Sequence, residues 1–374
     1  MAQSVRTFQR AITTITGEAL KLSGRKTRVA VVGVGGIGNR VHVPAYKNNN
    51  SVDLIALVDT DEKTAKRVAR KFNVKRVFSS TEELFKSEEI DAVSICTPPD
   101  SHAKIALQAF ANGAHVLCEK PLANDLSAGS QMVRASKAKD KILIVGCNRR
   151  FTPNYQEAKR CILRGDIGHI YCIEDQFVEP NPLFSWTKSA WFLDPGVGGV
   201  LNDLGPHIFD LFNYLFDEYP IAVSAFKTTY LNSPVEESSS FIVEYPGGRS
   251  GIGKVSWLSS TVMESIGIYG TAQNLFASPN FLVKINPNDI QEVALWRAAS
   301  ESLLSLKFPK LSFLRVKRDD PYQREIDSFI KRIRGSGGFS KDALNALSVL
   351  AACKATQEAA TKRCRIEIPK PEEL

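Results

Sequence analysis

The sequence predicts an α/β domain with a doubly wound parallel sheet, followed by an α+β part with an open, mostly antiparallel sheet. Three observations carry this prediction. Residues 28–146 alternate short apolar runs with helical patterns. The first apolar run leads into a glycine turn that opens a helix. After about residue 150 the alternation ends and segments rich in Val, Ile, Phe, Thr and Ser follow. A chain of 374 residues is long enough for two such domains.

The first half reads as five strands connected by helices. Strands are expected near 28–33, 53–59, 91–95, 114–118 and 142–146, and helices near 37–47, 61–73, 101–112 and 125–138. Strands joined by helices are parallel, with right-handed crossovers. Thr97, Lys120 and Asn148 then follow the carboxyl ends of strands, which is where such sheets bind ligands.

The second half reads as an open antiparallel sheet with helices on one face. Its expected strands are 170–178, 221–231, 238–246, 250–259 and 262–270, separated by turns such as Tyr245-Pro246-Gly247-Gly248. We therefore predict an N-terminal extension at 1–28, a nucleotide-binding domain at 29–148, and a domain for substrate binding and oligomerisation at 149–374.

The glycine turn has the spacing of a diphosphate-binding loop, with Gly36 and Ile37 inside it. Gly33 permits the tight turn, Gly35 lets the backbone approach a diphosphate, and Gly38 lets the helix pack closely on the strand. The positive end of the helix then attracts the anion. Taken alone, the same motif also fits an ordinary strand-to-helix corner.

Asp59 strengthens the interpretation as a dinucleotide site. It follows the second strand, 21 residues after Gly38, where a carboxylate accepts hydrogen bonds from ribose hydroxyls. An acid there favours NAD over NADP, because it repels a 2′-phosphate, although Lys63 and Arg67 are close enough in sequence to weaken that preference. The alternative is that Asp59 caps the helix that Thr60-Asp61-Glu62 opens.

A second motif, Ala114 to Pro121, reads as a later strand that ends in the charged corner Glu119-Lys120-Pro121. In a parallel sheet this corner lies near the reactive ring of the cofactor, so the two motifs together indicate hydride-transfer chemistry. The alternative for Lys120 is a solvated surface lysine.

Asp203 and His207 are four residues apart, so a helix starting near Asp203 would carry both on one face. Oxidation of a secondary alcohol needs a base for the hydroxyl proton, and histidine is suited to this near neutral pH. Lys120 would stabilise the developing alkoxide, and Asp203 would orient substrate and lysine. The alternative for His207 is a capping or core histidine.

Four blocks of the sequence together resemble the Gfo/Idh/MocA family of oxidoreductases, over roughly residues 28–370. The blocks are Gly33–Gly38 with Asp59, Cys96-Thr97-Pro98-Pro99-Asp100-Ser101-His102, Glu119-Lys120-Pro121, and Gly198-Gly199-Val200-Leu201-Asn202-Asp203-Leu204-Gly205-Pro206-His207. One departure is visible: Val197 stands where the family often has a first glycine, which leaves the path of that loop open.

The resemblance implies a Rossmann domain, a catalytic set of Lys120, Asp203 and His207, and a cis bond before Pro121. It adds Thr97, Pro98, His102, Glu119 and Lys120 to the cofactor site, and it places Asn148, Arg149, Arg150, Asn202 and His207 at the substrate. It also implies a dimer or tetramer formed through the open sheet. Trp186 and Trp191 precede the glycine loop and either stack on a sugar or pack in the core.

Composition excludes several other classes of protein. No apolar run approaches the ~18 residues that span a bilayer. The seven cysteines form no CxxC pair and are expected to be reduced and buried, without a metal site. The net charge of +8 is confined to two segments, 1–28 and 295–318, each with six basic residues and one acidic residue. The rest of the chain is nearly neutral, which argues against nucleic-acid binding.

Both basic segments are amphipathic: Val5, Phe8, Ile12, Ile15, Ala19 and Leu22 form one stripe, and Trp296, Ala299, Leu303 and Leu306 form another. They either dock on the body or a partner subunit, or lie on an anionic membrane surface. A cleaved organellar transit peptide is a third alternative.

We therefore predict a cytoplasmic NAD-dependent oxidoreductase that acts on a hydroxyl or keto group of a sugar, cyclitol or nucleotide sugar. The main alternative is a protein that senses the nicotinamide cofactor without turnover, which would have no reason to keep Lys120, Asp203 and His207 together. A narrower alternative is redox-neutral hydrolysis that uses NAD transiently, against which the Glu119-Lys120-Pro121 corner argues. The substrate itself is not encoded in any motif.

Overall fold

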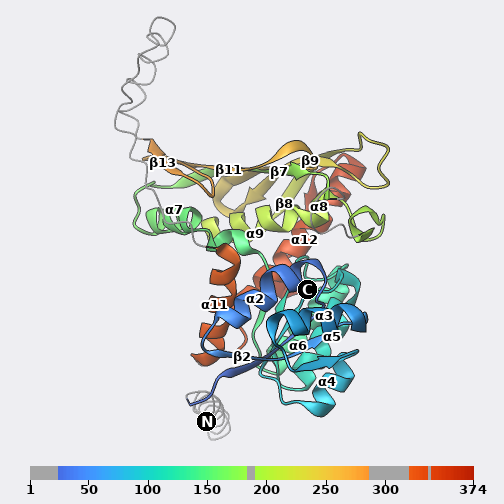
Figure 1. Ribbon diagram of the computed structural model, residues 1–374. Coiled ribbons are helices and arrows are strands. Elements are labelled where there is room, and N and C mark those ends of the chain that lie inside the picture. Colours follow the sequence, from blue (N-terminus) through green and yellow to red (C-terminus); the bar gives the residue numbers. More distant parts are fainter. Residues whose placement is uncertain (1–23, 183–189, 286–319, 336–337) are drawn as a thin grey trace, which may run out of the picture. The chain divides into compact units, whose positions relative to one another are not determined.

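The computed structural model describes residues 24–182, 190–285, 320–335 and 338–374, which fall into two compact units (Figure 1). The first unit comprises the described residues up to Cys147 together with Tyr322–Leu350 and Leu374. The second comprises the described parts of Asn148–Pro321 and Ala351–Glu373. The amphipathic stripes of segments 1–28 and 295–318, and Trp186, lie outside the described residues.

The first unit is built on a six-stranded parallel sheet, so the predicted doubly wound fold is confirmed. The strand order is β3-β2-β1-β4-β5-β6. The strands are β1 (Thr27–Val32), β2 (Val52–Val58), β3 (Arg76–Phe78), β4 (Ala92–Ile95), β5 (His115–Cys118) and β6 (Leu143–Val145). Five were predicted, and β3 is an additional edge strand of three residues.

Helices cover both faces of this sheet. They are α2 (Val43–Asn48), α3 (Glu62–Phe72), α4 (Thr81–Ser87), α5 (His102–Ala111) and α6 (Leu126–Ala138). Three begin at side chains that accept backbone N–H groups of the first turn: Asp61 for α3, Ser80 for α4 and Asp125 for α6. Successive residues of β1 point to opposite faces, so Ala30 and Val32 belong to one apolar core and Val29 and Val31 to the other.

The C-terminal helices begin in the first unit, whereas we expected all of 149–374 in the second domain. α11 (Pro321–Arg334) is amphipathic and buries Ile326, Phe329 and Ile330 in the core with Val29 and Leu57. The first part of α12 (Lys341–Lys362) adds Leu347 and Leu350 to the other core. The parallel sheet has apolar residues on both faces, and these helices return to cover them.

The second unit contains an eight-stranded sheet in the order β13-β12-β11-β7-β10-β9-β8-β14. Its strands are β7 (Ile170–Pro180), β8 (Ala222–Thr228), β9 (Ser238–Tyr245), β10 (Arg249–Ser256), β11 (Leu258–Gly270), β12 (Asn274–Ala277), β13 (Leu282–Ile285) and β14 (Ile366–Glu367). All neighbouring pairs are antiparallel except β7 and β10, which are parallel. The predicted mostly antiparallel sheet is thus confirmed, with three short strands more than expected.

One face of this sheet carries the helices α7 (Pro153–Leu163), α8 (Val200–Asp203) and α9 (Gly205–Phe216) (Figure 1). The alternation along β9 reflects this arrangement: Phe241, Val243 and Tyr245 are buried, while Ser240 and Ile242 are exposed. Ring stacking of Phe209 on Phe241 joins α9 to the sheet. The helices are therefore on one face, as the sequence predicts.

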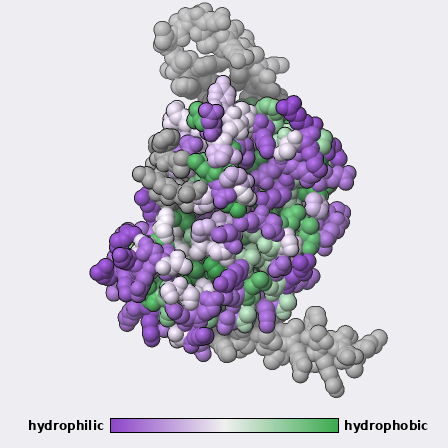
Figure 2. Space-filling view, turned by 90° about the vertical axis from the view of Figure 1, so that its right-hand side faces the viewer, coloured by the Kyte–Doolittle hydropathy of each residue, from purple (hydrophilic) through white to green (hydrophobic). Residues whose placement is uncertain are grey.

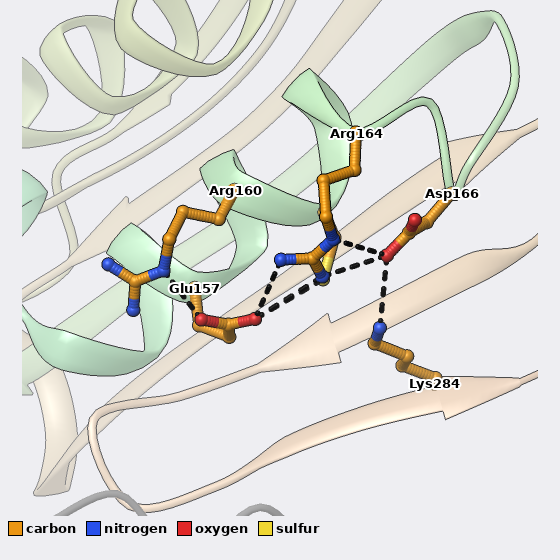
Figure 3. Close-up of polar contacts among 6 residues, drawn as sticks. Glu157, Arg160, Arg164, Asp166 and Lys284 are labelled. Carbon is orange, nitrogen blue, oxygen red and sulfur yellow. Dashed lines mark hydrogen bonds and ion pairs between the residues drawn. The ribbon is translucent and has the colours of Figure 1, made fainter.

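A network of charged side chains connects the end of α7 to the edge strand β13 (Figure 3). Arg164 donates to Asp166 at 2.8 Å and lies 3.4 Å from Glu157, and Lys284 donates to Asp166 at 3.2 Å. Arg160 donates to Glu157 at 2.6 Å. The hydrogen bond from Arg164, aided by Lys284, lowers the pKa of Asp166. Because these side chains are in contact with solvent, their ion pairs add little to the free energy of unfolding. They contribute more to the position of the edge strand β13.

In the described part of the chain, no helix is both long and apolar enough to cross a membrane. The face seen in Figure 2 is largely polar, with apolar side chains in separate small groups. All seven cysteines are free. Among the described residues there is also no group of three or more His, Cys, Asp or Glu side chains that could hold a metal.

Candidate active site

The glycine turn after β1 admits no side chain at two of its positions. Gly33 has φ of +86°, and a Cβ there would stand 2.6 Å from the carbonyl oxygen of Cys96. A Cβ on Gly38 would stand 2.1 Å from the carbonyl oxygen of Gly33. The chain can therefore follow this path only with glycine at both positions.

Gly35 is different, because it is exposed and an added Cβ would meet nothing within 4 Å. Gly36 and Ile37 beside it are partly exposed. The π-helical turn Gly38–His42 and α2 continue directly from this loop. The turn thus presents an open backbone surface, and the diphosphate-binding role stays a prediction.

The Asp59 carboxylate connects the end of β2 to the glycine turn. Its Oδ2 accepts from the N–H of Val34 at 2.8 Å, and its Oδ1 accepts from the N–H of Asp61 at 2.9 Å. The helix cap is Asp61, not Asp59, since the Asp61 side chain accepts from Lys63 and Thr64. Each Asp59 oxygen has a further lone pair, so the carboxylate can still accept from ribose hydroxyls.

The end of β4 is held to the corner after β5 by His102. Its Nε2 lies 2.9 Å from the Thr97 carbonyl and its Nδ1 lies 3.0 Å from the Pro121 carbonyl. Burial lowers the pKa of His102, although both carbonyls oppose that shift. Ser101 donates to the Thr97 hydroxyl at 2.6 Å. The ring of His102 is fully buried, so it supports the two loops.

The corner after β5 contains a cis bond between Lys120 and Pro121, as the resemblance implies. Lys120 is half-buried, whereas the neighbouring Glu119 is buried. The Glu119 carboxylate lies 2.8 Å from Nε2 of His42, so it points into the first unit. Pro98 precedes the short helical turn Pro99–Ser101, which leads into α5.

In the second unit, Asp203 and His207 lie on two helices and not on one. Asp203 ends α8, Leu204 forms the junction, and His207 lies in the first turn of α9. Pro206 has no N–H with which to continue the first helix, and it lies in the first turn of α9, which starts at Gly205. Both side chains are nevertheless almost completely buried.

Aromatic residues from the sheet hold these two side chains. Nε1 of Trp257 donates to Oδ2 of Asp203 at 3.1 Å, and Phe177 meets the His207 ring edge-on at 5.6 Å between centroids. Neither residue was singled out in the sequence, because no spacing relates position 257 or 177 to the helix. The contacts restrict the orientations available to the carboxylate and the imidazole.

Arg149 and Arg150 are each paired with carboxylates of the second unit. Arg149 binds Asp175 through two bonds of 2.8 Å and Glu264 through one of 3.0 Å. Burial opposes the charge of Arg149, but these carboxylates outweigh it and raise its pKa. Arg150 pairs with Asp210 on α9. These contacts anchor the helical turn Asn148–Phe151, in which Asn148 is buried.

Asn202 holds the loop that precedes α8. Its amide donates to the carbonyls of Val197 at 3.1 Å and Gly198 at 2.9 Å. Gly199 has φ of +95°, and a Cβ there would meet the Glu236 carboxylate at 2.3 Å. The backbone carbonyl of Val197 takes part in this hydrogen-bonded loop, as the carbonyl of a glycine would. Trp191 stacks on Phe192 at 4.1 Å between centroids and remains partly exposed.

Models of known protein families match parts of both units. A family model described as "Oxidoreductase family, NAD-binding Rossmann fold" matches residues 27–147, and one described as "GFO/IDH/MocA C-terminal domain" matches residues 155–275. The chain belongs to the Gfo/Idh/MocA family. It is thus an NAD-binding oxidoreductase, and the turn at Gly33–Gly38 with Asp59 lies within the part that matches the NAD-binding model.

Curated Gfo/Idh/MocA relatives match over most of their length. Myo-inositol 2-dehydrogenase of Thermotoga maritima is 24% identical over 82% of this chain and 88% of its own. Inositol 2-dehydrogenase of Rhizobium meliloti is 25% identical over 91% of this chain and 99% of its own. Both are dehydrogenases of cyclitols.

Solved structures show the same fold. Levoglucosan dehydrogenase in complex with NADH and L-sorbose superposes with a TM-score of 0.80 at 20% identity, covering 93% of this chain and 100% of that one. An NAD-binding oxidoreductase from Klebsiella pneumoniae gives 0.78 at 22% identity, covering 92% and 99%. The two-domain architecture is therefore that of the Gfo/Idh/MocA family.

Proposed function

We propose that this protein is an NAD-dependent dehydrogenase that transfers hydride between nicotinamide and a secondary hydroxyl or keto group of a sugar, cyclitol or nucleotide sugar. The observation that carries the proposal is the joint presence of Lys120, Asp203 and His207, each at a structured helix or strand end. The names of the relatives, which are inositol and glucoside dehydrogenases, support the substrate class.

His207 takes the hydroxyl proton while the carbon–hydrogen bond breaks and its electron pair leaves as hydride. Bound NAD supplies the acceptor for that hydride. Lys120 stabilises the oxygen as negative charge develops, and Asp203, held by Trp257, orients the reacting groups. Turnover with NAD and a panel of polyols, sugars and nucleotide sugars, followed at the absorbance of reduced nicotinamide, tests this function. Absence of turnover with every member would contradict it.

Contacts with the substrate are proposed for Asn148, Trp191, Asn202 and His207. Trp191 offers a partly exposed ring, which suits a sugar face. Arg149 and Arg150 were predicted at the substrate, but their guanidinium groups bind Asp175, Glu264 and Asp210. We therefore assign to both arginines a supporting role beneath that site. We assign a similar role to His102 beneath the cofactor.

Asp59 is expected to make the protein bind NAD(H) more tightly than NADP(H). A 2′-phosphate would have to approach a carboxylate that is already fixed by Val34 and Asp61. Calorimetry should show at least ~10-fold weaker binding of NADPH than of NADH, since a like-charge contact costs more than ~1.4 kcal/mol in a partly buried site. Asp59→Ala should reduce this ratio, with the matched control Asp61→Ala preserving it. Equal affinity in the wild type would shift attention to Lys63 and Arg67.

Trp257 is expected to position Asp203. Trp257→Phe keeps an aromatic ring but removes the N–H donor, so kcat/KM should fall by roughly 10-fold, which corresponds to one hydrogen bond of ~1.4 kcal/mol. Tyr245→Phe is the control, because it removes a buried hydrogen bond of 2.8 Å to Asn213 in the same unit. Equal losses in both variants would show a general packing effect.

A homo-oligomer, dimer or tetramer, is proposed from the face of the second sheet opposite the described helices α7, α8 and α9. Phe226, Ile242 and Ile252 are exposed there on the adjacent strands β8, β9 and β10, and Ile242 pairs directly with Ile252. A contiguous apolar patch of this kind is typical of an interface. Light scattering should give a multiple of 41.3 kDa, and a monomer would contradict the proposal.

A cytoplasmic location is proposed from the family and the free cysteines. Peripheral contact with an anionic membrane is proposed for segments 1–28 and 295–318 from their charge and apolar stripes alone. Co-sedimentation with anionic liposomes at low and high salt, with and without residues 1–28, tests it, and no binding at low salt would exclude it.

A further inference from the structure

Four buried polar side chains form a continuous hydrogen-bonded chain inside the first unit. The Tyr46 hydroxyl lies 2.7 Å from the Ser94 hydroxyl, and Ser94 lies 3.1 Å from Nδ1 of His42. Nε2 of His42 lies 2.8 Å from Oε1 of Glu119. The chain therefore runs from α2 through β4 and the π-helical turn to the residue immediately before Lys120.

This chain is sealed from solvent. Tyr46 and His42 are 1% exposed, Ser94 is 0% exposed and Glu119 is 8% exposed. Burying these groups costs free energy unless each is hydrogen-bonded. Here every group has a partner in the chain. A fully hydrogen-bonded buried chain of this kind fixes the orientation of its members.

The protons of the chain can all point in one direction. Tyr46 donates to Ser94, Ser94 donates to Nδ1 of His42, and Nε2–H of His42 donates to the Glu119 carboxylate. This order, inferred from the hydrogen-bonding pattern, gives every group a partner, with His42 accepting at Nδ1 and donating at Nε2. It makes His42 a fixed donor to Glu119.

Glu119 transmits this constraint to its neighbour. Its second oxygen, Oε2, accepts from the backbone N–H of Lys120 at 3.3 Å. Gly146 leaves room for the carboxylate, because a Cβ there would stand 3.2 Å from it. Burial raises the pKa of Glu119, but the hydrogen bond from His42 and the positive charge of Lys120 favour the ionised form, and the pKa is lowered overall. The carboxylate is therefore ionised beside Lys120.

We propose that His42 is a positioning residue for Lys120, acting through the Glu119 carboxylate. This rests on the proposed function, in which Lys120 acts on the substrate oxygen. Without the N–H of His42, the carboxylate loses the bond that fixes its rotamer, and Lys120 loses a fixed acceptor and counter-charge. The glycine turn and Asp59 do not depend on His42 contacts with Glu119, so cofactor affinity should persist.

The experiment compares His42→Leu and His42→Gln in the full chain. His42→Leu should lower kcat by about 10²-fold, the effect of misplacing a reacting group by about 1 Å, with the Kd for NADH within about 3-fold of wild type. His42→Gln keeps an N–H donor toward Glu119 and should recover most of the lost kcat. His115→Gln is the matched control, because His115 is also buried and lies on β5, but its Nδ1 accepts from the N–H of Ile142.

Three results would overturn the proposal: kcat losses no larger in His42→Leu than in His115→Gln, a parallel loss of NADH affinity, or no recovery in His42→Gln. If His42→Leu fails to fold, Glu119→Gln replaces it, and the double variant with His42→Gln should lose no more kcat than Glu119→Gln alone. Additive losses in that cycle would contradict the coupling.

A readout without turnover separates this proposal from the proposed function. In ¹⁵N NMR, the His42 ring should carry its proton on Nε2, and His42→Leu should shift the backbone amide of Lys120 while His115→Gln does not. An unshifted Lys120 amide would overturn the positioning role whether or not a substrate has been found. Absence of turnover in the wild type, with these NMR results intact, would contradict only the proposed function.

Discussion

Replacing Lys120 with alanine is expected to lower kcat by about 10²- to 10³-fold, the usual effect of removing one donor to a developing oxyanion. The affinity for NADH should stay within a few-fold of wild type. The glycine turn, which we propose binds the dinucleotide, is held to Asp59 through the backbone N–H of Val34. Stopped-flow measurement of nicotinamide reduction, with cofactor binding measured by fluorescence, checks both parts.

Lys104→Ala is the control, since Lys104 is an exposed lysine of α5 in the same unit. It should keep native turnover. If Lys120→Ala retains near-native turnover, Lys120 does not take part in the reaction. If the wild type binds NADH but turns over no sugar, cyclitol or nucleotide sugar, the cofactor-sensing alternative gains support.

The first sheet could be predicted closely because its strands are buried on both faces. Runs such as Val29–Val32 and Leu54–Val58 are continuous and apolar. The helices that follow β2 and β5 have recognisable starts at Asp61 and Asp125. The strands that escaped prediction are β3, β12, β13 and β14. They have two to four residues at or near a sheet edge, too few for an alternating pattern to emerge.

A different reason explains why the sequence did not predict that α11 and the first part of α12 belong to the first unit. Their helical patterns show which side chains are apolar, but not which core receives them. Ile326 and Phe329 pack with strand residues nearly 300 positions earlier in the chain. Contacts at such separation leave no local signal.

In the candidate site, too, some features could be predicted from the sequence and others could not. Residues at the ends of strands, such as Thr97 and Lys120, followed from topology alone. The hydrogen-bond partners of the site residues could not be predicted in this way. Arg149 is neutralised by Asp175 and Glu264, which are 26 and 115 residues away, and His42 reaches Glu119 across 77 residues. Sequence patterns can place polar residues at a site, but only the structure shows which of them are already engaged.

His207 gives the second large effect that we expect. If it is the base that takes the hydroxyl proton, His207→Asn should lower kcat/KM for alcohol oxidation by about 10²- to 10⁴-fold near neutral pH. The loss should shrink as pH rises, because hydroxide then replaces the missing base. Its edge contact with Phe177 and its burial argue that the ring is held in place, so asparagine should leave the fold intact.

The pH profile distinguishes a base from a structural histidine. Wild-type kcat/KM should fall as pH is lowered, because a protonated imidazole can no longer accept the hydroxyl proton, and this acid limb should disappear in His207→Asn. His169→Ala is the control: His169 is exposed in the same unit, and its loss should leave the limb unchanged. A His207→Asn enzyme with the wild-type limb would assign the base to another group, and Asp203, held by Trp257, would then be the next residue to test.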